Sequence, residues 1–242
     1  MSTAFAEKCR KVVCIGRNYY DHILELNNAR PSQPFFFLKP PSSMLLPGKG
    51  PILAPNGVNL HYEVELALVM GKTMRDFEYK NKAPAEALKE AIDHIAGYTV
   101  AIDMTARNVQ DEIKKKGLPW TTAKGFDTFL PISAFIPKAK VPNPADVTLF
   151  LSVNGKNPPN QKDSTNLMMF PIPELLSAIS SVMTIEPGDI VLTGTPKGVG
   201  AVVPGDHIDA GLEVGGVAVE ESKISLDVAD KGGIYSFNTN KS

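Results

Sequence analysis

Three carboxylates interrupt two strand-like stretches that are otherwise mostly apolar. Glu63 and Glu65 stand within residues 61–66, and Asp103 follows residues 98–102. Side chains of a strand repeat every second residue, so Glu63 and Glu65 point to the same face. Two adjacent carboxylates repel each other, and burying them without a positive partner is costly. Three hard oxygen ligands, with the remaining positions left to water or substrate, suit Mg²⁺ or Mn²⁺.

The residues around the two glutamates decide how this pair is interpreted. A Glu-x-Glu pair also occurs on the wet face of an amphipathic strand, where it has no special role. Here the face with both glutamates continues with Ala67 and Val69, whereas a solvated face would stay polar. The opposite face is apolar throughout: Val64, Leu66, Leu68 and Met70. The pattern therefore favours burial, and it leaves a metal site and a solvated pair both open.

A histidine and a carboxylate three residues apart form a second candidate group. His22 and Glu25 share one face if residues 20–26 form a helical turn. A carboxylate beside an imidazole orients it and raises its basicity, which suits a general base that activates water. From spacing alone, a surface pair with little energetic effect is the better interpretation.

Other polar side chains could bind an anionic substrate. Arg107, Gln110 and Asp111 share a helical face after Asp103, and arginine binds carboxylates with two parallel hydrogen bonds. Lys124 lies among small and aromatic residues, where a buried ammonium could stabilise a developing oxyanion. Each has a simpler explanation: a solvated helix face for the first group and a snorkelling surface lysine for Lys124.

A glycine-rich segment follows an apolar strand near the end of the sequence. Residues 194–200 contain three glycines, which allow the backbone to approach a ligand closely, and Thr195 offers an N–H group and a hydroxyl. The segment is either a tight turn or a loop that binds a substrate carboxylate.

The elements that would position these side chains are short strands and few helices. Strands are expected at 11–16, 35–39, 98–102 and 190–193, and helices at 84–95, 105–116 and 173–183. Gly97 is expected to end the first of these helices and Thr105 to cap the second. The pattern predicts a β-rich α+β fold. Residues 27–51 are rich in Pro, Asn, Ser and Gly, which predicts a small N-terminal lobe over 1–48 and a main body over 49–242.

Composition excludes several functional classes. The 242 residues are 43% hydrophobic and 21% charged with a net charge of −1, which gives no indication of nucleic-acid binding. The basic run 114–116 closes an expected helix, where cations are favoured. No apolar run approaches the length of a membrane span. Two cysteines five residues apart fit a reducing compartment, and the N-terminus shows no clear targeting signal, so we expect a cytoplasmic or mitochondrial protein.

Taken together, these segments resemble the fumarylacetoacetate hydrolase superfamily, and most closely its acylpyruvase and oxaloacetate decarboxylase branch. The resemblance extends over nearly the whole chain. It includes residues 16–19 with His22 and Glu25, residues 37–40, 61–65, 103–107 and 115–120, Lys124, and residues 188–200. Each motif is weak alone, but their order and spacing together are specific.

The resemblance implies a role for each matching residue. It implies a mixed β-sheet roll, usually dimeric, that acts on a small 2-keto acid. The metal, Mg²⁺ or Mn²⁺, would be held by Glu63, Glu65 and Asp103. Lys124 would lie beside the metal and contact the enolate or carboxylate of the substrate, while His22 and Glu25 would lie on a lid and activate water. The acid group of the substrate would be bound by Arg17, Lys39, Arg107, Gln110 and Thr195.

One loop departs from the family pattern. Relatives usually read V-N-G-E-x-R-Q there, whereas this chain has Val153-Asn154-Gly155-Lys156-Asn157-Pro158-Pro159-Asn160-Gln161, which lacks the arginine. The contacts that this loop makes in relatives therefore do not carry over to this chain from the resemblance.

The leading expectation is hydrolysis of 3-acylpyruvates, with oxaloacetate decarboxylation as a second activity. Both reactions break a C–C bond beta to the 2-keto group and leave pyruvate enolate, which a chelated metal stabilises. An oxaloacetate keto–enol tautomerase is the alternative, because it needs the same enolate site. A non-catalytic binding protein on this fold is a third possibility.

One substitution can test whether His22 serves hydrolysis and not decarboxylation. Hydrolysis needs an activated water at the acyl carbonyl, whereas decarboxylation does not. We therefore expect His22→Ala to reduce acylpyruvate hydrolysis far more than oxaloacetate decarboxylation, measured as pyruvate release from each substrate. Equal losses in both assays would contradict this role of His22.

Overall fold

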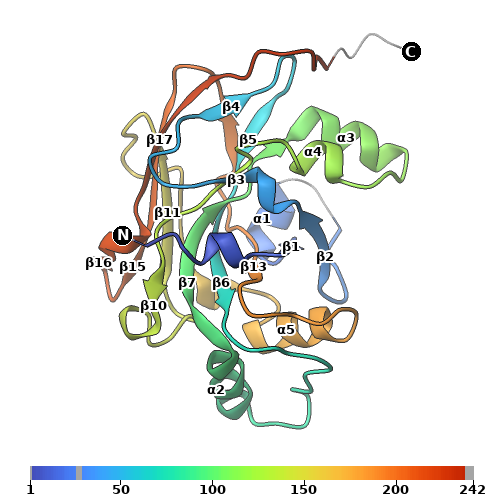
Figure 1. Cartoon of the computed structure of the whole chain (residues 1–242), viewed down its shortest axis with the longest axis vertical. Helices are drawn as coiled ribbons and strands as arrows, with labels where there is room; N and C mark the ends of the chain where they lie inside the picture. Colours follow the sequence, from blue (N-terminus) through green and yellow to red (C-terminus); the bar gives the residue numbers. More distant parts are fainter. Residues whose placement is uncertain (1, 26–28, 238–242) are drawn as a thin grey trace.

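Two β-sheets and a few helices form the protein in a computed structural model that describes residues 2–25 and 29–237. One sheet has the strand order β10-β7-β6-β13-β1-β2, and the other has the order β12-β11-β15-β17-β4 with β16 paired to β15. Two smaller sheets have the orders β14-β5-β8 and β3-β9. This strand-rich mixture of parallel and antiparallel pairs confirms the predicted β-rich α+β class (Figure 1).

The strands are mostly short. Their bounds are β1 Val12–Gly16, β2 Phe35–Lys39, β3 Met44–Leu45, β4 Ile52–Ala54, β5 Leu60–Tyr62, β6 Val64–Met70, β7 Ile95–Ile102, β8 Thr105–Ala106, β9 Leu130–Pro131, β10 Ile136–Pro137, β11 Thr148–Val153, β12 Gln161–Ser164, β13 Ile190–Leu192, β14 Gly200–Val202, β15 His207–Val214, β16 Val217–Ala218 and β17 Ile224–Asp230. The α-helices are α1 Tyr20–Glu25, α2 Pro84–His94, α3 Arg107–Lys115, α4 Thr121–Lys124 and α5 Ile172–Ser180.

Strand β6 separates two hydrophobic clusters. All seven of its residues are buried, and its alternate side chains pack on opposite sides. Val64, Leu66, Leu68 and Met70 belong to the large core, whereas Ala67 belongs to a smaller cluster with residues of β1, β7 and β13. The face of β6 that carries Glu65 is therefore buried, as the apolar residues after Glu65 predict.

The β6–β7 pairing places the third carboxylate opposite the first. The two strands are antiparallel, with Val64 opposite Ile102 and Glu65 opposite Ala101. Beyond the last pair, the Asp103 N–H donates to the Glu63 carbonyl over 2.8 Å. Residues forty positions apart in the sequence thus meet at one end of the sheet.

Helices α3 and α4 contact each other and lie beside the end of β8, well away from α2 and α5 (Figure 1). The latter two pack together at the far end of the molecule, where α2 leads directly into β7. Helices α3 and α4, together with α1, bring side chains to the carboxylate end of β6.

Two residues that were expected to end or cap a helix have other roles in the structure. Gly97 does not end α2: β7 already begins at Ile95, and a Cβ at position 97 would lie 2.3 Å from the Phe135 ring, so glycine is needed for packing inside the strand. Thr105 does not cap α3. It lies in β8 opposite His61, and its hydroxyl donates to the Asp103 carbonyl over 3.2 Å. Strand pairing outweighed the local capping preference in both places.

The N-terminal segment contributes strands to the main sheet. β1 pairs in parallel with β13 and antiparallel with β2, so Val12–Gly16 and Phe35–Lys39 share a sheet with β6. A division of the chain near residue 48 stays a prediction about folding units. None of the described helices is long and apolar enough to cross a membrane.

Asn18 ties the turn after β1 to two distant segments. Its amide donates to the Phe170 carbonyl over 3.1 Å and to the Thr193 carbonyl over 2.8 Å, and its oxygen accepts the Phe170 N–H over 2.8 Å. The side chain is fully buried. These bonds fix the start of α1 relative to the end of β13.

Loss of these bonds would leave buried polar groups without partners. We expect Asn18→Ala to lower the free energy of unfolding by about 2–4 kcal/mol, because orphaned buried groups retain their full desolvation cost. Urea denaturation measures this change. Asn81→Ala is the matched control, since Asn81 is exposed and bonds only Glu78. Similar midpoints for both variants would contradict the bracing role of Asn18.

Candidate active site

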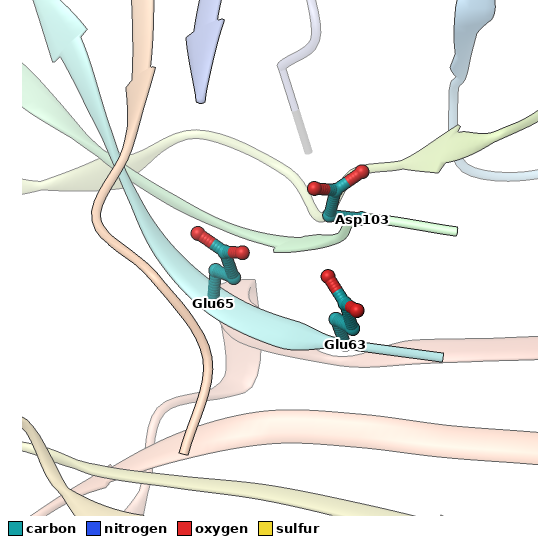
Figure 2. A group of neighbouring side chains, drawn as sticks. All are labelled: Glu63, Glu65 and Asp103. Carbon is teal, nitrogen blue, oxygen red and sulfur yellow. The ribbon is translucent and has the colours of Figure 1, made fainter. Parts of the chain in front are cut away.

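Glu63, Glu65 and Asp103 converge at the end of β6 and β7 (Figure 2). One ligand atom from each carboxylate lies within 4.8 Å of the others. Figure 2 shows both glutamates rising from one side of the β6 chain toward Asp103. All three are buried, with 6%, 1% and 2% of their surfaces exposed respectively. The structure thus brings together all three side chains that the sequence singled out.

Two buried lysines neutralise part of this negative charge. The Lys124 ammonium donates to Glu63 Oε2 over 2.8 Å and to Asp103 Oδ2 over 2.7 Å. Burial alone would lower the pKa of Lys124, but the charges of Asp103 and Glu63 outweigh it and raise the pKa. Lys39, at the end of β2, donates to Asp103 Oδ1 over 2.5 Å and to the Met104 carbonyl over 3.0 Å. Lys124 is therefore a charged donor, and Lys39 orients a carboxylate.

Glu65 is the carboxylate with the least compensation. Its Oε2 accepts the Gly194 N–H over 2.5 Å. Burial, followed by the charges of Asp103 and Glu63, raises its pKa well above the usual value. By contrast, Lys124 and Arg107 outweigh burial at Glu63 and hold its pKa low. A cation bound beside Glu65 would compensate the charge of its ionised carboxylate, as Lys124 and Arg107 do for Glu63.

The donor set fits a hard divalent cation. Three carboxylates in a buried cluster offer only oxygen ligands, which Mg²⁺ and Mn²⁺ accept and soft metals disfavour. The group lacks the thiol and imidazole ligands typical of zinc. Glu63, Glu65 and Asp103 would hold the ion, and the absence of a side-chain cation within 4.0 Å of Glu65 among the described residues supports this assignment.

Arg107 and Gln110 lie on the face of α3 that is turned toward the carboxylates. One Arg107 nitrogen contacts Glu63 Oε1, and another donates to Gln110 Oε1 over 2.7 Å. Both residues are buried, and both line the same pocket as the three carboxylates. Asp111, expected on the same face, is exposed.

The loop after β13 is held against β6 by Thr195 and Gln161. The Thr195 hydroxyl donates to the Val64 carbonyl over 2.8 Å and accepts from Gln161 Nε2 over 2.9 Å. Gln161 also accepts the Val64 N–H over 3.0 Å and donates to the Pro196 carbonyl. The Thr195 hydroxyl thus positions the loop, and a substrate contact from Thr195 stays a prediction.

Gln161 is a site residue that sequence reasoning missed. It is fully buried and fixes both the glycine loop and the backbone between the two glutamates. A glutamine also ends the family pattern of the divergent loop, and this was the signal available in the sequence, although Gln161 stands two positions further from Val153 than in that pattern.

His22 and Glu25 belong to α1, which is attached to the glycine loop. His22 is 5% exposed and lines the pocket, and its Nδ1 lies 3.5 Å from Glu25 Oε2. Both Glu25 oxygens accept the Gly198 N–H over 3.1 Å, and Lys197 pairs with Asp21 over 2.7 Å. Burial raises the pKa of Glu25, but His22 and Gly198 outweigh it and lower the pKa.

The pocket joins these groups into one site. Beside the carboxylates it is lined by the predicted residues Arg17, His22, Arg107, Gln110, Lys124 and Thr195, and by Ile15, Gly16, Phe37, Lys114 and Trp120. Lys39 and Glu25 are not among the lining residues, but Lys39 contacts Asp103 and Glu25 contacts His22. Nine of the eleven predicted residues therefore share one pocket, and the other two contact pocket residues. Their individual roles stay predictions.

Comparisons with known proteins agree with this arrangement. The family model described as fumarylacetoacetate (FAA) hydrolase C-terminal matches residues 11–221. The mitochondrial oxaloacetate tautomerase oaa1 of Schizosaccharomyces pombe is 55% identical over 205 residues, which cover 84% of this chain and 88% of that protein. A mitochondrial oxaloacetate decarboxylase of Dictyostelium discoideum is 51% identical over 209 residues, covering 86% of this chain and 91% of that protein.

Solved structures give the same fold. A yeast fumarylacetoacetate hydrolase family protein superimposes with a TM-score of 0.86 at 42% identity, covering 98% of this chain and all of that one. The fumarylpyruvate hydrolase of Pseudomonas aeruginosa, in complex with Mn²⁺ and pyruvate, superimposes with a TM-score of 0.78 at 32% identity. The match covers 92% of this chain and 91% of that one.

Removal of one carboxylate tests the metal assignment. We expect Mg²⁺ or Mn²⁺ to raise the melting temperature of the wild-type protein, because a ligand that binds only the folded state stabilises it. Glu65→Gln and Asp103→Asn should abolish this rise. Glu65→Gln should leave the metal-free melting temperature unchanged or higher, since the amide cannot ionise beside Asp103 and Glu63 and keeps an acceptor for Gly194.

Thermal scans with and without each metal give the result. Asp111→Asn, on the exposed side of α3, is the matched control and should keep the full metal-dependent rise. A full rise in Glu65→Gln would remove that carboxylate from the proposed ligand set.

Proposed function

Because this chain belongs to the fumarylacetoacetate hydrolase family, we propose that it is a divalent-metal-dependent oxaloacetate keto–enol tautomerase. The observation that carries the proposal is the buried carboxylate cluster with the charged Lys124 donor inside the pocket. The S. pombe relative, named an oxaloacetate tautomerase, supports this reaction more directly than hydrolysis of 3-acylpyruvates. The comparisons thus favour the alternative expectation over the leading one.

The reaction moves a proton between C3 and the C2 oxygen of oxaloacetate. Its intermediate is an enolate, whose negative charge must be stabilised in a site that excludes water. When bound, Mg²⁺ or Mn²⁺ supplies a Lewis acid for that oxygen. The chain itself must orient the substrate and handle the proton.

Lys124 is the residue we assign to the developing oxyanion. The charges of Asp103 and Glu63 raise its pKa despite burial, which favours the ammonium form that donates hydrogen bonds. It is 2% exposed, and in a low-dielectric pocket such a donor is more effective than in water. The same two carboxylates that fix its position keep it charged.

We assign the C1 carboxylate of the substrate to Arg107, Gln110 and the loop that contains Thr195. Arg107 keeps donor capacity beyond its contacts with Glu63 and Gln110, because a guanidinium has five N–H groups. The glycine loop is rigidly attached to β6 through Gln161, so its backbone can face a ligand without reorganisation.

His22 is the group we assign to the proton at C3. Its imidazole lies inside the pocket, and Glu25 lies behind it at 3.5 Å. An imidazole has one ring nitrogen that accepts a proton and one that donates, as a proton transfer at C3 requires. Glu25 is in turn fixed by the Gly198 N–H, which orients the pair.

Oxaloacetate decarboxylation or acylpyruvate hydrolysis is a second candidate. The D. discoideum relative is named a decarboxylase, and the P. aeruginosa structure holds Mn²⁺ and pyruvate in a fumarylpyruvate hydrolase. These reactions form the same kind of enolate, and the His22–Glu25 pair could activate the water that hydrolysis needs. The mitochondrial names of both relatives support a mitochondrial location for this chain, and a homodimer stays a prediction.

Ketonisation of enol-oxaloacetate tests the proposed function. We expect the metal-loaded protein to accelerate loss of the ultraviolet absorbance of the enol, and chelation of the metal to remove the effect. Lys124→Met should lower the rate by roughly 10²–10³-fold, as loss of an oxyanion donor does in other enzymes. Lys115→Met is the control, because Lys115 is exposed and pairs with Glu112.

Pyruvate should be measured in the same reactions. Enol loss without pyruvate formation supports the tautomerase. Pyruvate formation at the rate of enol loss would assign decarboxylation instead, and absence of metal-dependent enol loss would contradict the proposal.

A further inference from the structure

Lys114 reaches the pocket, although its two neighbours do not. On α3 it follows Arg107 and Gln110 at helical spacing, and all three line the pocket. Lys115 is instead 71% exposed and pairs with Glu112 over 3.1 Å, and Lys116 is also exposed. The basic run thus divides between one pocket residue and two surface residues.

Three aromatic rings form a wall between the buried Lys124 and the partly exposed Lys114, and we take the side of Lys114 as the entrance of the pocket. Phe35 and Phe37 lie on the same side of β2, and Trp120 packs against both, with ring centroids 5.9 and 5.1 Å away. The Lys124 amine lies 5.2 Å from the Phe37 centroid, and the Lys114 amine lies 5.7 Å from that of Trp120. The wall therefore separates the two lysines along the pocket.

Arg17 is a third cation beside this aromatic wall. Its guanidinium carbon lies 5.7 Å from the centroid of Phe35, and it also lines the pocket. It follows Gly16, where a Cβ would lie 2.2 Å from the Phe35 ring, so glycine permits this approach. Lys124 is buried, whereas Lys114 and Arg17 are only partly buried.

The inner and outer cations differ in how they are neutralised. Lys124 and Arg107 contact Glu63 or Asp103. Among residues 2–25 and 29–237, no carboxylate lies within 4.0 Å of the side-chain nitrogens of Lys114 or Arg17. Burial, followed by the charges of Arg107 and Arg17, lowers the pKa of Lys114. The entrance therefore carries positive charge that an anion would compensate.

We propose that Lys114, together with Arg17, binds the second carboxylate of a dicarboxylic 2-keto acid and makes the site selective for such substrates. The inference rests on the proposed function, which places the keto acid end at Glu63, Glu65 and Asp103. The other end of a short dicarboxylate then extends along the aromatic wall toward Lys114. A keto acid with an uncharged chain would leave both outer cations without a partner.

Two stable ligands differ only in this second carboxylate. Malate and 2-hydroxybutanoate of the same configuration share the C1 carboxylate and C2 hydroxyl, and a methyl group in the latter replaces the C4 carboxylate of malate. Calorimetric titration of the Mg²⁺-loaded protein with each ligand measures their binding without any turnover.

We expect the wild-type protein to bind malate at least tenfold more tightly, since a hydrogen bond to a charged group changes affinity by about ten- to a hundredfold. Lys114→Met keeps the aliphatic stem on Trp120 but removes the charge. It should weaken malate binding by roughly tenfold and leave 2-hydroxybutanoate binding unchanged. Lys114→Arg should retain the preference, and Lys115→Met is the matched control.

Two results would overturn the inference. An unchanged malate preference in Lys114→Met would show that the charge does not contact the second carboxylate. Equal weakening of both ligands would show that Lys114 only supports the pocket. A wild-type protein that fails to ketonise oxaloacetate but prefers malate through Lys114 would support the inference and contradict only the proposed reaction.

Discussion

Burial of three carboxylates at one end of a sheet is the constraint on which the rest of the site depends. Glu63, Glu65 and Asp103 lie within a few ångströms of one another with almost no access to water. Such a cluster is stable only if positive charge surrounds it. Lys39, Lys124 and Arg107 provide part of that charge, and each comes from a different element. The sheet, α3 and α4 are thus held together around one electrostatic requirement.

The same requirement determines what the site can do. Asp103 and Glu63 raise the pKa of Lys124, which favours the ammonium that we propose as the donor to an oxyanion. Burial and the neighbouring acids raise the pKa of Glu65, and a bound divalent cation would favour its ionised form. Lys114 and Arg17 lack a carboxylate within 4.0 Å among the described residues, which is why we propose that they bind an anionic group. The charge balance of the site and the proposed substrate preference thus rest on the same side chains.

Sequence reasoning succeeded where local periodicity is decisive. The common face of Glu63 and Glu65 follows from the two-residue repeat of a strand, and the predicted strand 35–39 is the one observed as β2. It failed where distant pairing prevails: Thr105 pairs with β5 instead of capping α3, and Gly97 lies inside β7 because Phe135 packs on it. The role of Gln161 and the position of Lys39 behind Asp103 also depend on contacts across more than sixty residues. Periodicity carries no information on such contacts.

The opposition of Glu63 and Asp103 across β6 and β7 has a consequence for the order of assembly. When these strands pair, their acidic ends meet, and repulsion disfavours this end of the pair until Lys39 and Lys124 arrive. Lys39 precedes both strands in the sequence and Lys124 follows them, so the paired strands β6 and β7 supply neither lysine. We therefore expect this corner to form late and cooperatively, with the surrounding sheet already in place. A chain in which Glu63 and Asp103 have come together with both lysines has therefore completed nearly all of its fold.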